Sequence, residues 1–147
     1  MKTYRVLLTA TIALAMMAGV ACQKKGPKTS SVVEVEDINL EMIHFDFDKY
    51  NIKAQYQQVL ERHAGWLKEN PSVNVIIEGN TDEWGTEEYN LALGERRAVA
   101  AKNYLTNLGV SPDRLSTISY GESRPIDPAH NPTAWAMNRR DEFKGRK

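Results

Sequence analysis

The feature that most constrains the fold is an apolar stretch followed at once by an acidic turn and a long helical pattern. Residues 73–78 are mostly β-branched, which predicts a buried strand. Residues 79–85 are polar and contain two glycines, as a tight turn would. Thr86 is a good N-cap and Gly109 a typical residue after a helix end. A helix is therefore expected over residues 86–108.

One side of this expected helix carries a charge among apolar residues. With a period of 3.6, the residues that share this side are Leu93, Arg97, Ala100, Tyr104 and Leu108. A buried arginine is costly unless a partner compensates its charge, and the chain path brings Asp82 back over the helix. Two interpretations remain open. Arg97 and Asp82 form an internal ion pair, or they line a cleft for a zwitterion, with Arg97 binding a carboxylate and Asp82 an ammonium group.

Short motifs follow one another in a fixed order between residues 40 and 144. They are Phe45-Asp46-Phe47-Asp48-Lys49-Tyr50, Gly79-Asn80-Thr81-Asp82-Glu83, Leu93-Gly94-Glu95-Arg96-Arg97-Ala98 and Asn138-Arg139-Arg140. In these motifs the chain resembles the OmpA-like peptidoglycan-binding domains. The resemblance implies a two-layer α/β (α+β) fold that binds peptidoglycan and is not an enzyme.

The resemblance also implies a set of ligand-binding residues. In this family an aspartate in the turn and an arginine 15 residues later hold the free end of diaminopimelate in the peptidoglycan stem peptide, and Asp82 and Arg97 stand at these positions. Asp48 matches a position beside the same pocket and is expected to be a second partner of the ammonium group. Asn90 lies seven residues before Arg97 and can offer its amide to the ligand, or is a helix-surface asparagine. A departure is Trp84, where lipoprotein members of the family often carry arginine.

Composition excludes several classes of function. Lys+Arg and Asp+Glu both number 19 in 147 residues, so no excess of positive charge indicates a nucleic-acid partner. The single cysteine rules out an internal disulfide, and no Cys/His group has the spacing of a zinc site. We therefore expect one domain that needs no metal and no cofactor.

The N-terminus predicts export and lipid attachment. Residues 1–21 have a basic start and an apolar run that is short for a membrane span, as in a signal peptide. Cys22 follows this run directly and resembles the lipidated cysteine of bacterial lipoproteins; a secretory signal with an incidental cysteine is the alternative. Gln23 resembles the outer-membrane sorting pattern. Residues 22–33 are expected to form a lipidated, flexible tether, and residues 34–147 the peptidoglycan-binding domain.

The remaining elements complete a β-α-β-α-β-(α)-β order. Strands are predicted at residues 42–47, 73–78, 115–120 and 139–143, and helices at residues 54–69, 86–108 and 134–137. This order predicts a mixed sheet with helices on one face. His63 falls on the apolar side of the first helix and is predicted to be a core histidine with its hydrogen bonds satisfied. No role is predicted for residues 145–147.

Two nearby carboxylates, Asp46 and Asp48, could in principle serve acid–base catalysis or bind calcium. Neither possibility has its remaining parts, because no nucleophile-plus-base set and no calcium-ligand spacing accompanies them. We interpret Asp46 as structural. Arg139 and Arg140 are either a basic edge of the site or a solvated pair, and we expect at least one of them to be structural.

The leading hypothesis is an outer-membrane lipoprotein, anchored through Cys22, that binds peptidoglycan non-covalently and ties the outer membrane to the cell wall. The alternative is a periplasmic protein-docking adaptor in which wall binding is secondary. The resemblance implies this alternative too, because lipoprotein members of the family bind the periplasmic protein TolB within the Tol system of envelope integrity and cell division.

Overall fold

The structure, a computed structural model, describes residues 38–147. The predictions for the signal peptide, Cys22 and the tether therefore lie outside the described residues. Along the described chain the elements are β1 (Ile38–His44), α1 (Ala54–Glu69), β2 (Asn74–Asn80), α2 (Glu87–Asn107), the short 3-10 helix η1 (Pro112–Arg114), β3 (Leu115–Gly121), α3 (Pro132–Asn138) and β4 (Arg140–Arg146).

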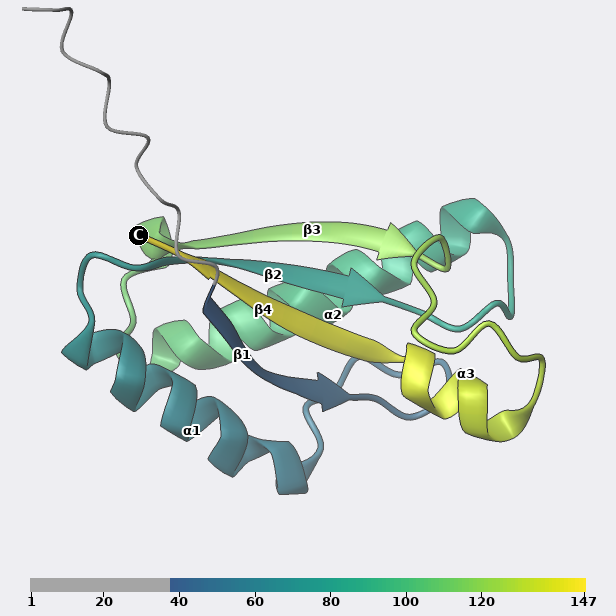
Figure 1. Cartoon of the computed structure of the whole chain (residues 1–147), viewed down its shortest axis with the longest axis horizontal. Coiled ribbons are helices and arrows are strands. Elements are labelled where there is room, and N and C mark those ends of the chain that lie inside the picture. Colours follow the sequence, from purple (N-terminus) through teal and green to yellow (C-terminus); the bar gives the residue numbers. More distant parts are fainter. Residues whose placement is uncertain (1–37) are drawn as a thin grey trace, which may run out of the picture. The chain divides into compact units, whose positions relative to one another are not determined.

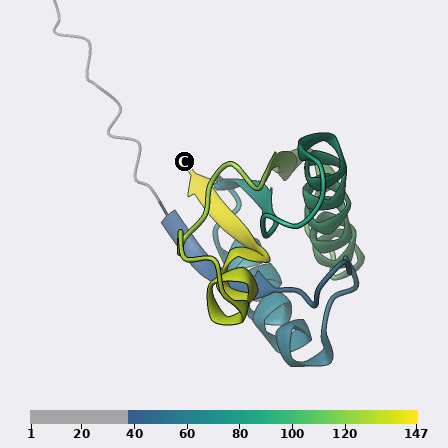
Figure 2. The ribbon, with the colours of Figure 1, turned by 90° about the vertical axis from the view of Figure 1, so that its right-hand side faces the viewer.

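The four strands form one mixed sheet in the order β1-β4-β2-β3. β4 is antiparallel to both β1 and β2, whereas β2 and β3 are parallel because α2 carries the chain back between them. α1 and α2 lie together behind the sheet (Figure 1), and the end-on view shows the helix layer on one side of the strands (Figure 2). The predicted two-layer α/β fold with helices on one face is confirmed.

The sheet has one buried and one polar face. Along β2, Val75 and Ile77 are buried, while the alternate residues Ile76 and Glu78 are only partly buried on the opposite face, where the Glu78 carboxylate is 4.0 Å from the Arg124 guanidinium. This alternation is what a strand with one solvated face requires. The core between sheet and helices is built from large apolar side chains: Ile43, Phe45, Val59, Leu60, Leu67, Val73, Val75, Ile77, Leu105, Leu115 and Phe143.

α2 begins and ends as its sequence predicts. The Thr86 hydroxyl accepts a hydrogen bond from the Tyr89 backbone N–H at 3.2 Å, and Gly109 has φ of +91° after the last turn. The buried side of the helix differs from the predicted one. It comprises Asn90, Leu93, Gly94, Arg97, Ala98, Ala101 and Leu105. The predicted side was right at Leu93 and Arg97, whereas Ala100, Tyr104 and Leu108 are only partly buried, Tyr104 and Leu108 packing at the margin of the core. The small Gly94, Ala98 and Ala101 let the helix turn their face onto the sheet.

At one point the backbone of α2 is in direct contact with the backbone of β2. A Cβ atom added to Gly79 of β2 would lie 2.0 Å from the carbonyl oxygen of Gly94, and one added to Gly94 would lie 2.3 Å from the Ser119 hydroxyl. Both glycines are needed because backbone meets backbone here. This contact fixes the height of the first turns of α2 above the ends of β2 and β3.

Two strand boundaries differ from those predicted. β1 begins at Ile38 and ends at His44, so Asp46 lies in the loop that follows and not in the strand. β4 continues to Arg146, although no role was predicted for residues 145–147. β4 lies between β1 and β2, and pairing on both sides stabilises a strand whose polar sequence has little strand propensity.

The carboxyl ends of β1, β2 and β3 all lie at the same end of the sheet, where β4 begins (Figure 1). The described chain enters at Ile38, which pairs with Gly145 at the opposite end, close to the C-terminus. Side chains in the loops after the three strands can therefore meet at one end of the domain, and the chain preceding Ile38 joins the other end.

His63 is a core residue, as predicted, but its hydrogen bonds are not satisfied. It is 4% exposed, neither ring nitrogen has a hydrogen-bond partner in the described residues, and its ring meets Phe143 edge-on at 4.8 Å. Burial, opposed by Glu41 and assisted slightly by Arg62, lowers the pKa of His63 from 6.5 to about 4. The folded protein therefore holds a neutral imidazole.

We expect His63 to reduce the stability of the domain as the pH falls from about 6.5 toward 4. The unfolded chain binds a proton at His63 in this range and the folded chain does not, so the free energy of unfolding decreases by about 2 kcal/mol by pH 5. Urea unfolding at pH 7 and pH 5 measures this loss. His63→Leu should remove most of the difference; an equally large difference in that variant would show that another group is responsible.

Candidate functional site

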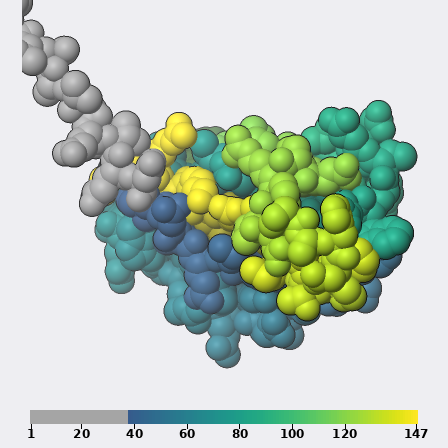
Figure 3. All heavy atoms as spheres, turned by 45° about the vertical axis from the view of Figure 1, so that its right-hand side comes forward, coloured from purple at the N-terminus to yellow at the C-terminus, as the bar shows by residue number. Residues whose placement is uncertain are grey.

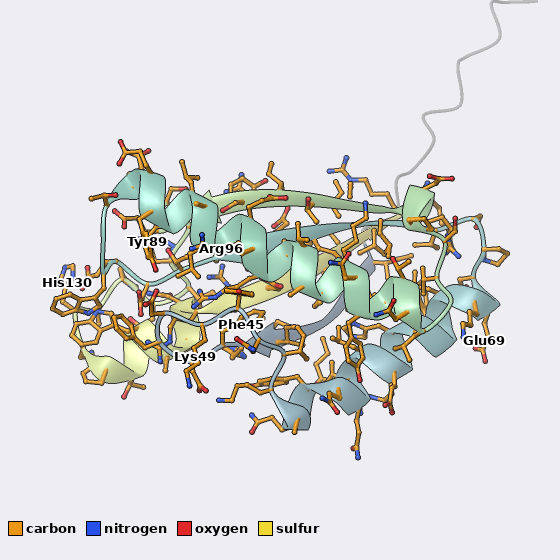
Figure 4. The ribbon with its side chains drawn as sticks, turned by 180° about the vertical axis from the view of Figure 1, so that it is seen from behind. Phe45, Lys49, Glu69, Tyr89, Arg96 and His130 are labelled. Carbon is orange, nitrogen blue, oxygen red and sulfur yellow. The ribbon has the colours of Figure 1, made fainter. Side chains whose placement is uncertain are left out.

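Three loops and one short helix gather at the end of the sheet where β1, β2 and β3 finish. In Figure 4, Phe45, Lys49, Tyr89, Arg96 and His130 all lie toward this end, and Glu69 lies at the other. In the space-filling view (Figure 3), the residues of the β3–α3 loop and of α3, coloured green to yellow, form the surface here beside the teal start of α2. Residues distant in sequence therefore share one surface.

Asp82, in the turn after β2, is the most buried carboxylate facing this surface. It is 3% exposed, and its Oδ2 accepts a hydrogen bond from the Arg139 guanidinium at 2.9 Å. Of the two interpretations that the sequence left open, the internal Arg97–Asp82 ion pair is not formed, because the structure pairs Asp82 with Arg139. Arg139 also donates to the Phe45 carbonyl at 3.2 Å, which ties the start of β4 to the end of β1. Arg139 therefore lies at the edge of this surface with its charge paired, and the alternative of a solvated Arg139–Arg140 pair is wrong.

Arg140, its neighbour, is structural. It is 4% exposed, and its guanidinium binds the Glu142 carboxylate at 2.5 Å and the Arg124 carbonyl at 3.1 Å. Asp46 is structural as well, since its carboxylate accepts a hydrogen bond from the Lys53 ammonium at 2.8 Å. That contact with Lys53 lowers the pKa of Asp46. The structural role predicted for Asp46 agrees with this contact.

Asp48 presents a second carboxylate to the same surface. Its backbone has φ of +56°, the left-handed conformation that aspartate adopts more readily than most residues. The Tyr89 hydroxyl, from the first turn of α2, donates a hydrogen bond to Asp48 Oδ1, and this bond raises the pKa of Tyr89. The contact connects the β1–α1 loop to α2 and holds the carboxylate in place.

Arg97 lies inside the domain. It is 0% exposed and donates to three backbone carbonyls: Lys49 at 2.9 Å, Asn80 at 2.8 Å and Asp46 at 3.2 Å. Its guanidinium carbon lies 5.0 Å above the centre of the Phe45 ring. Arg97 therefore joins the loop that carries Asp48 to the end of the strand that leads to Asp82.

The buried guanidinium lies in a field of acidic groups. Burial lowers the pKa of Arg97 to about 10, while Asp141, Asp82 and Asp48 oppose the shift, and the arginine stays charged at neutral pH. Asp141 is fully buried on β4 with no hydrogen-bond partner for either carboxylate oxygen among the described residues, and burial raises its pKa well above the usual range. Arg97 is its largest favourable electrostatic contact.

Asn90 is fully buried and is not the helix-surface asparagine of the alternative interpretation. Its side-chain Nδ2 donates to the Glu122 carboxylate at 2.5 Å, and within residues 38–147 its Oδ1 accepts from no group. A buried amide oxygen without a donor is unusual and can indicate a ligand. Asn90 thus joins α2 to the loop after β3.

The side chains of Asp48 and Asp82 both line a surface depression of about 250 Å³. It is lined by Phe47, Asp48, Asp82, Trp84, Gly85, Tyr89 and Leu93, and we call it the acidic pocket. Of the four predicted ligand-binding residues, Asp48 and Asp82 line it. Arg97 and Asn90 do not, since both are closed off from solvent.

Phe47, Tyr89 and Trp135 were not predicted as part of the site, and Trp84 was singled out only as a departure from the family's pattern. Tyr89 holds Asp48, and Trp84 meets Trp135 of α3 edge-on at 5.2 Å between ring centres. A signal existed, because Phe47 and Trp84 are large apolar residues in otherwise polar loops, and such exposed residues often mark binding surfaces. Trp135 gave no comparable signal, since its place beside Trp84 depends on the path of the β3–α3 loop.

Two further classes of site are absent from the described part of the chain. Residues 38–147 contain no group of three or more His, Cys, Asp or Glu side chains arranged to hold a metal ion. Neither α1, α2 nor α3 has the length and apolar surface that a membrane-spanning helix requires.

Comparison with known proteins identifies the relatives of this chain. Residues 44–139 match the model of the OmpA family. The peptidoglycan-associated lipoprotein of Pasteurella multocida is 42% identical over 144 residues, 95% of either chain. That of Haemophilus influenzae is 50% identical over 98 residues, 67% of this chain and 64% of its own. The crystal structure of the Burkholderia pseudomallei peptidoglycan-associated lipoprotein has a TM-score of 0.70 at 43% identity, covering 71% of this chain and 88% of that one.

Proposed function

The chain belongs to the OmpA family, and on this premise we propose that it is an outer-membrane lipoprotein that binds peptidoglycan without catalysing a reaction on it. The names of its relatives support both parts of the proposal, the lipid anchor and the wall contact. Cys22 would carry the lipid. Ile38 lies at the end of the domain opposite the acidic pocket.

The observation that carries the proposal is that Asp48 and Asp82, from two different loops, line one small depression. Each carboxylate is held by a hydrogen bond, from Tyr89 and from Arg139 respectively, so the pocket is arranged before a ligand arrives. Two carboxylates favour an ammonium group. The free end of diaminopimelate in a peptidoglycan stem peptide carries an ammonium and a carboxylate on the same carbon atom.

Arg97 and Asn90 would act from below the pocket surface. A guanidinium has five N–H groups, and three hydrogen bonds from Arg97 go to backbone carbonyls, which leaves two for a ligand carboxylate. The residues that cover Arg97 would have to move for this contact to form. The Asn90 Oδ1, which has no donor in the described residues, would accept a hydrogen bond from the ligand. Arg139, at the pocket's border, is a second cation for the carboxylate.

The proposal is tested by titrating residues 34–147, which form one compact unit with its own core, against two stem peptides. One ends in meso-diaminopimelate and the other in lysine, which lacks the carboxylate beside the terminal amine. We expect the diaminopimelate peptide to bind roughly 10- to 100-fold more tightly, the worth of one charge-assisted contact. Asp82→Asn should weaken its binding by a similar factor.

Asp113→Asn is the matched control, because Asp113 is an exposed aspartate in η1, before the start of β3 and far from the pocket. It should leave the affinity unchanged. Equal affinities for the two peptides, or equal effects of the two aspartate substitutions, would refute the assignment of the acidic pocket.

A protein partner is the second candidate for the same surface. Three aromatic side chains that line the pocket are exposed: Phe47, Trp84 and Tyr89. Exposed apolar groups of this kind can form a protein-docking surface. A partner of the TolB type within a Tol system, acting in envelope integrity and cell division, would compete with the wall for this end of the domain. In-cell crosslinking of the wild type and Asp82→Asn separates the two contacts, since only the wall contact should depend on Asp82.

A further inference from the structure

A second depression, of about 380 Å³, lies beside the acidic pocket and has a different chemistry. Its walls are Phe47, Trp84, Pro132 and Trp135, which we call the aromatic corner, and its polar groups are Asp82 and Arg139. Trp84 and Trp135 meet at an interplanar angle of 80°, so two indole rings stand nearly at right angles. Trp84 is 54% exposed and Phe47 58% exposed, which leaves large aromatic surface uncovered.

The aromatic corner is held in place by hydrogen bonds outside the depression. Glu83 Oε1 accepts from the Trp135 indole N–H at 2.7 Å, and Glu83 Oε2 lies 2.6 Å from His130 Nδ1. The bond from Trp135 lowers the pKa of Glu83. Asn131 caps α3 by accepting from the Ala134 N–H at 3.0 Å. The Trp135 ring is thereby fixed before binding, which lowers the entropic cost of using it as a contact surface.

The two depressions adjoin one another. Phe47, Asp82 and Trp84 line both, and the Asp82–Arg139 ion pair lies at their shared border. A molecule whose amino-acid end occupies the acidic pocket would therefore extend into the aromatic corner. Whatever the next part of that molecule is, it meets aromatic faces on the sides and a carboxylate and a guanidinium at one edge.

We propose that the aromatic corner binds a pyranose ring of the peptidoglycan glycan, an N-acetylated amino sugar joined to the stem peptide held in the acidic pocket. The inference rests on the proposed function and adds the glycan to its ligand. The C–H face of a pyranose is apolar and packs on the electron-rich face of an indole. Its hydroxyl and acetamide groups need donors and acceptors, which Arg139 and Asp82 supply. The depression is far larger than the methyl group of an alanine in the stem peptide.

The test compares three ligands on residues 34–147 by calorimetric titration. They are the free diaminopimelate stem peptide, the same peptide extended by D-alanine, and the same peptide attached to its N-acetylglucosaminyl-N-acetylmuramic acid disaccharide. We expect the disaccharide to raise the affinity roughly fivefold to tenfold, the effect of about one aromatic contact, and D-alanine to leave it unchanged. Because Trp84 lines both depressions, Trp84→Ala should lower the affinity for the disaccharide peptide roughly fivefold to tenfold more than the affinity for the free peptide, and Trp84→Phe should keep part of the gain.

Tyr50→Ala is the matched control, because Tyr50 is a similarly exposed aromatic residue that lines neither depression. It should keep the full gain. The inference is overturned if the disaccharide adds nothing in the wild type, if D-alanine produces the gain instead, or if Trp84→Ala weakens all three ligands equally. Failure of the proposed function looks different, since then none of the three ligands binds the wild type.

Discussion

Arg97→Met is expected to destabilise the domain by about 3–5 kcal/mol, the cost of breaking a buried charged network. The substitution leaves the carbonyls of Asp46, Lys49 and Asn80 without their donor in a buried place. It also removes the largest favourable electrostatic contact of Asp141. Urea unfolding at pH 7 measures the change in the free energy of unfolding.

The matched control is Arg96→Met, one residue earlier on the same helix. Arg96 is exposed and its guanidinium carbon lies 5.8 Å and 5.7 Å from the ring centres of Tyr50 and Tyr89. Contacts of this kind at exposed sites contribute less than about 1 kcal/mol, so the control should unfold close to the wild type. If both variants lost the same stability, Arg97 would not have the structural role given to it here.

Binding experiments on Arg97 variants measure two effects at once. Because Arg97 holds the Asp48 loop and the end of β2 together, a loss of peptidoglycan binding in an Arg97 variant combines a lost ligand contact with a displaced pocket. Asp82→Asn is the cleaner substitution, since it preserves the shape of the side chain and the backbone around it. We therefore place the test of the proposed function on Asp82.

Gly79→Ala should also have a large effect, a loss of about 3 kcal/mol in the free energy of unfolding. The new Cβ atom would lie 2.0 Å from the Gly94 carbonyl oxygen, and since the obstructing atom is backbone, α2 as a whole must move away from the sheet. We expect binding of the diaminopimelate peptide to fall with stability, because the same movement separates the start of α2, with Tyr89, from the acidic turn. Thermal unfolding and peptide titration measure the two effects.

Gly65→Ala provides the comparison. Gly65 lies within α1, and nothing stands within 4 Å of the position of a new Cβ atom. Replacing glycine by alanine in a helix without steric conflict should raise stability by about 0.5–1 kcal/mol. Gly79→Ala should lower the free energy of unfolding and Gly65→Ala should raise it. This difference separates the requirement for close backbone contact at Gly79 from the general cost of a glycine in regular secondary structure. A Gly79→Ala variant as stable as the wild type would show that α2 does not pack against β2 as described.

Much of the fold could be predicted because its signals are local. The β-branched run of β2, the Thr86 cap and the Gly109 terminus act within a few residues, and the elements built on them were found where expected. The last strand was predicted to end too early, at residue 143. The polar residues of β4 have little strand propensity of their own, and pairing with β1 and β2 on either side stabilises them as a strand. His63 was placed in the core by its helical period, but a period says nothing about hydrogen-bond partners.

The candidate site divides in the same way. Asp48, Asp82, Asn90 and Arg97 were chosen from sequence and all four lie at one end of the sheet, but their role as ligand-binding residues stays a prediction. Of the two interpretations left open for Arg97 and Asp82, the ion pair is not formed, and Arg139 is the partner of Asp82. Arg139 reaches it from 57 residues away, and an arginine has no local signal for the carboxylate it will meet.

The sequence by itself determined the order of strands and helices, the inward position of Arg97 and the acidic turn facing it, because helix period, capping and turn chemistry depend on neighbouring residues alone. Only the tertiary structure decided that Arg97 binds backbone carbonyls, that Asp82 pairs with Arg139, and that Trp84 and Trp135 form one corner beside the acidic pocket. These contacts depend on how closely α2 approaches the sheet and on where the β3–α3 loop passes. Both are results of packing between distant segments.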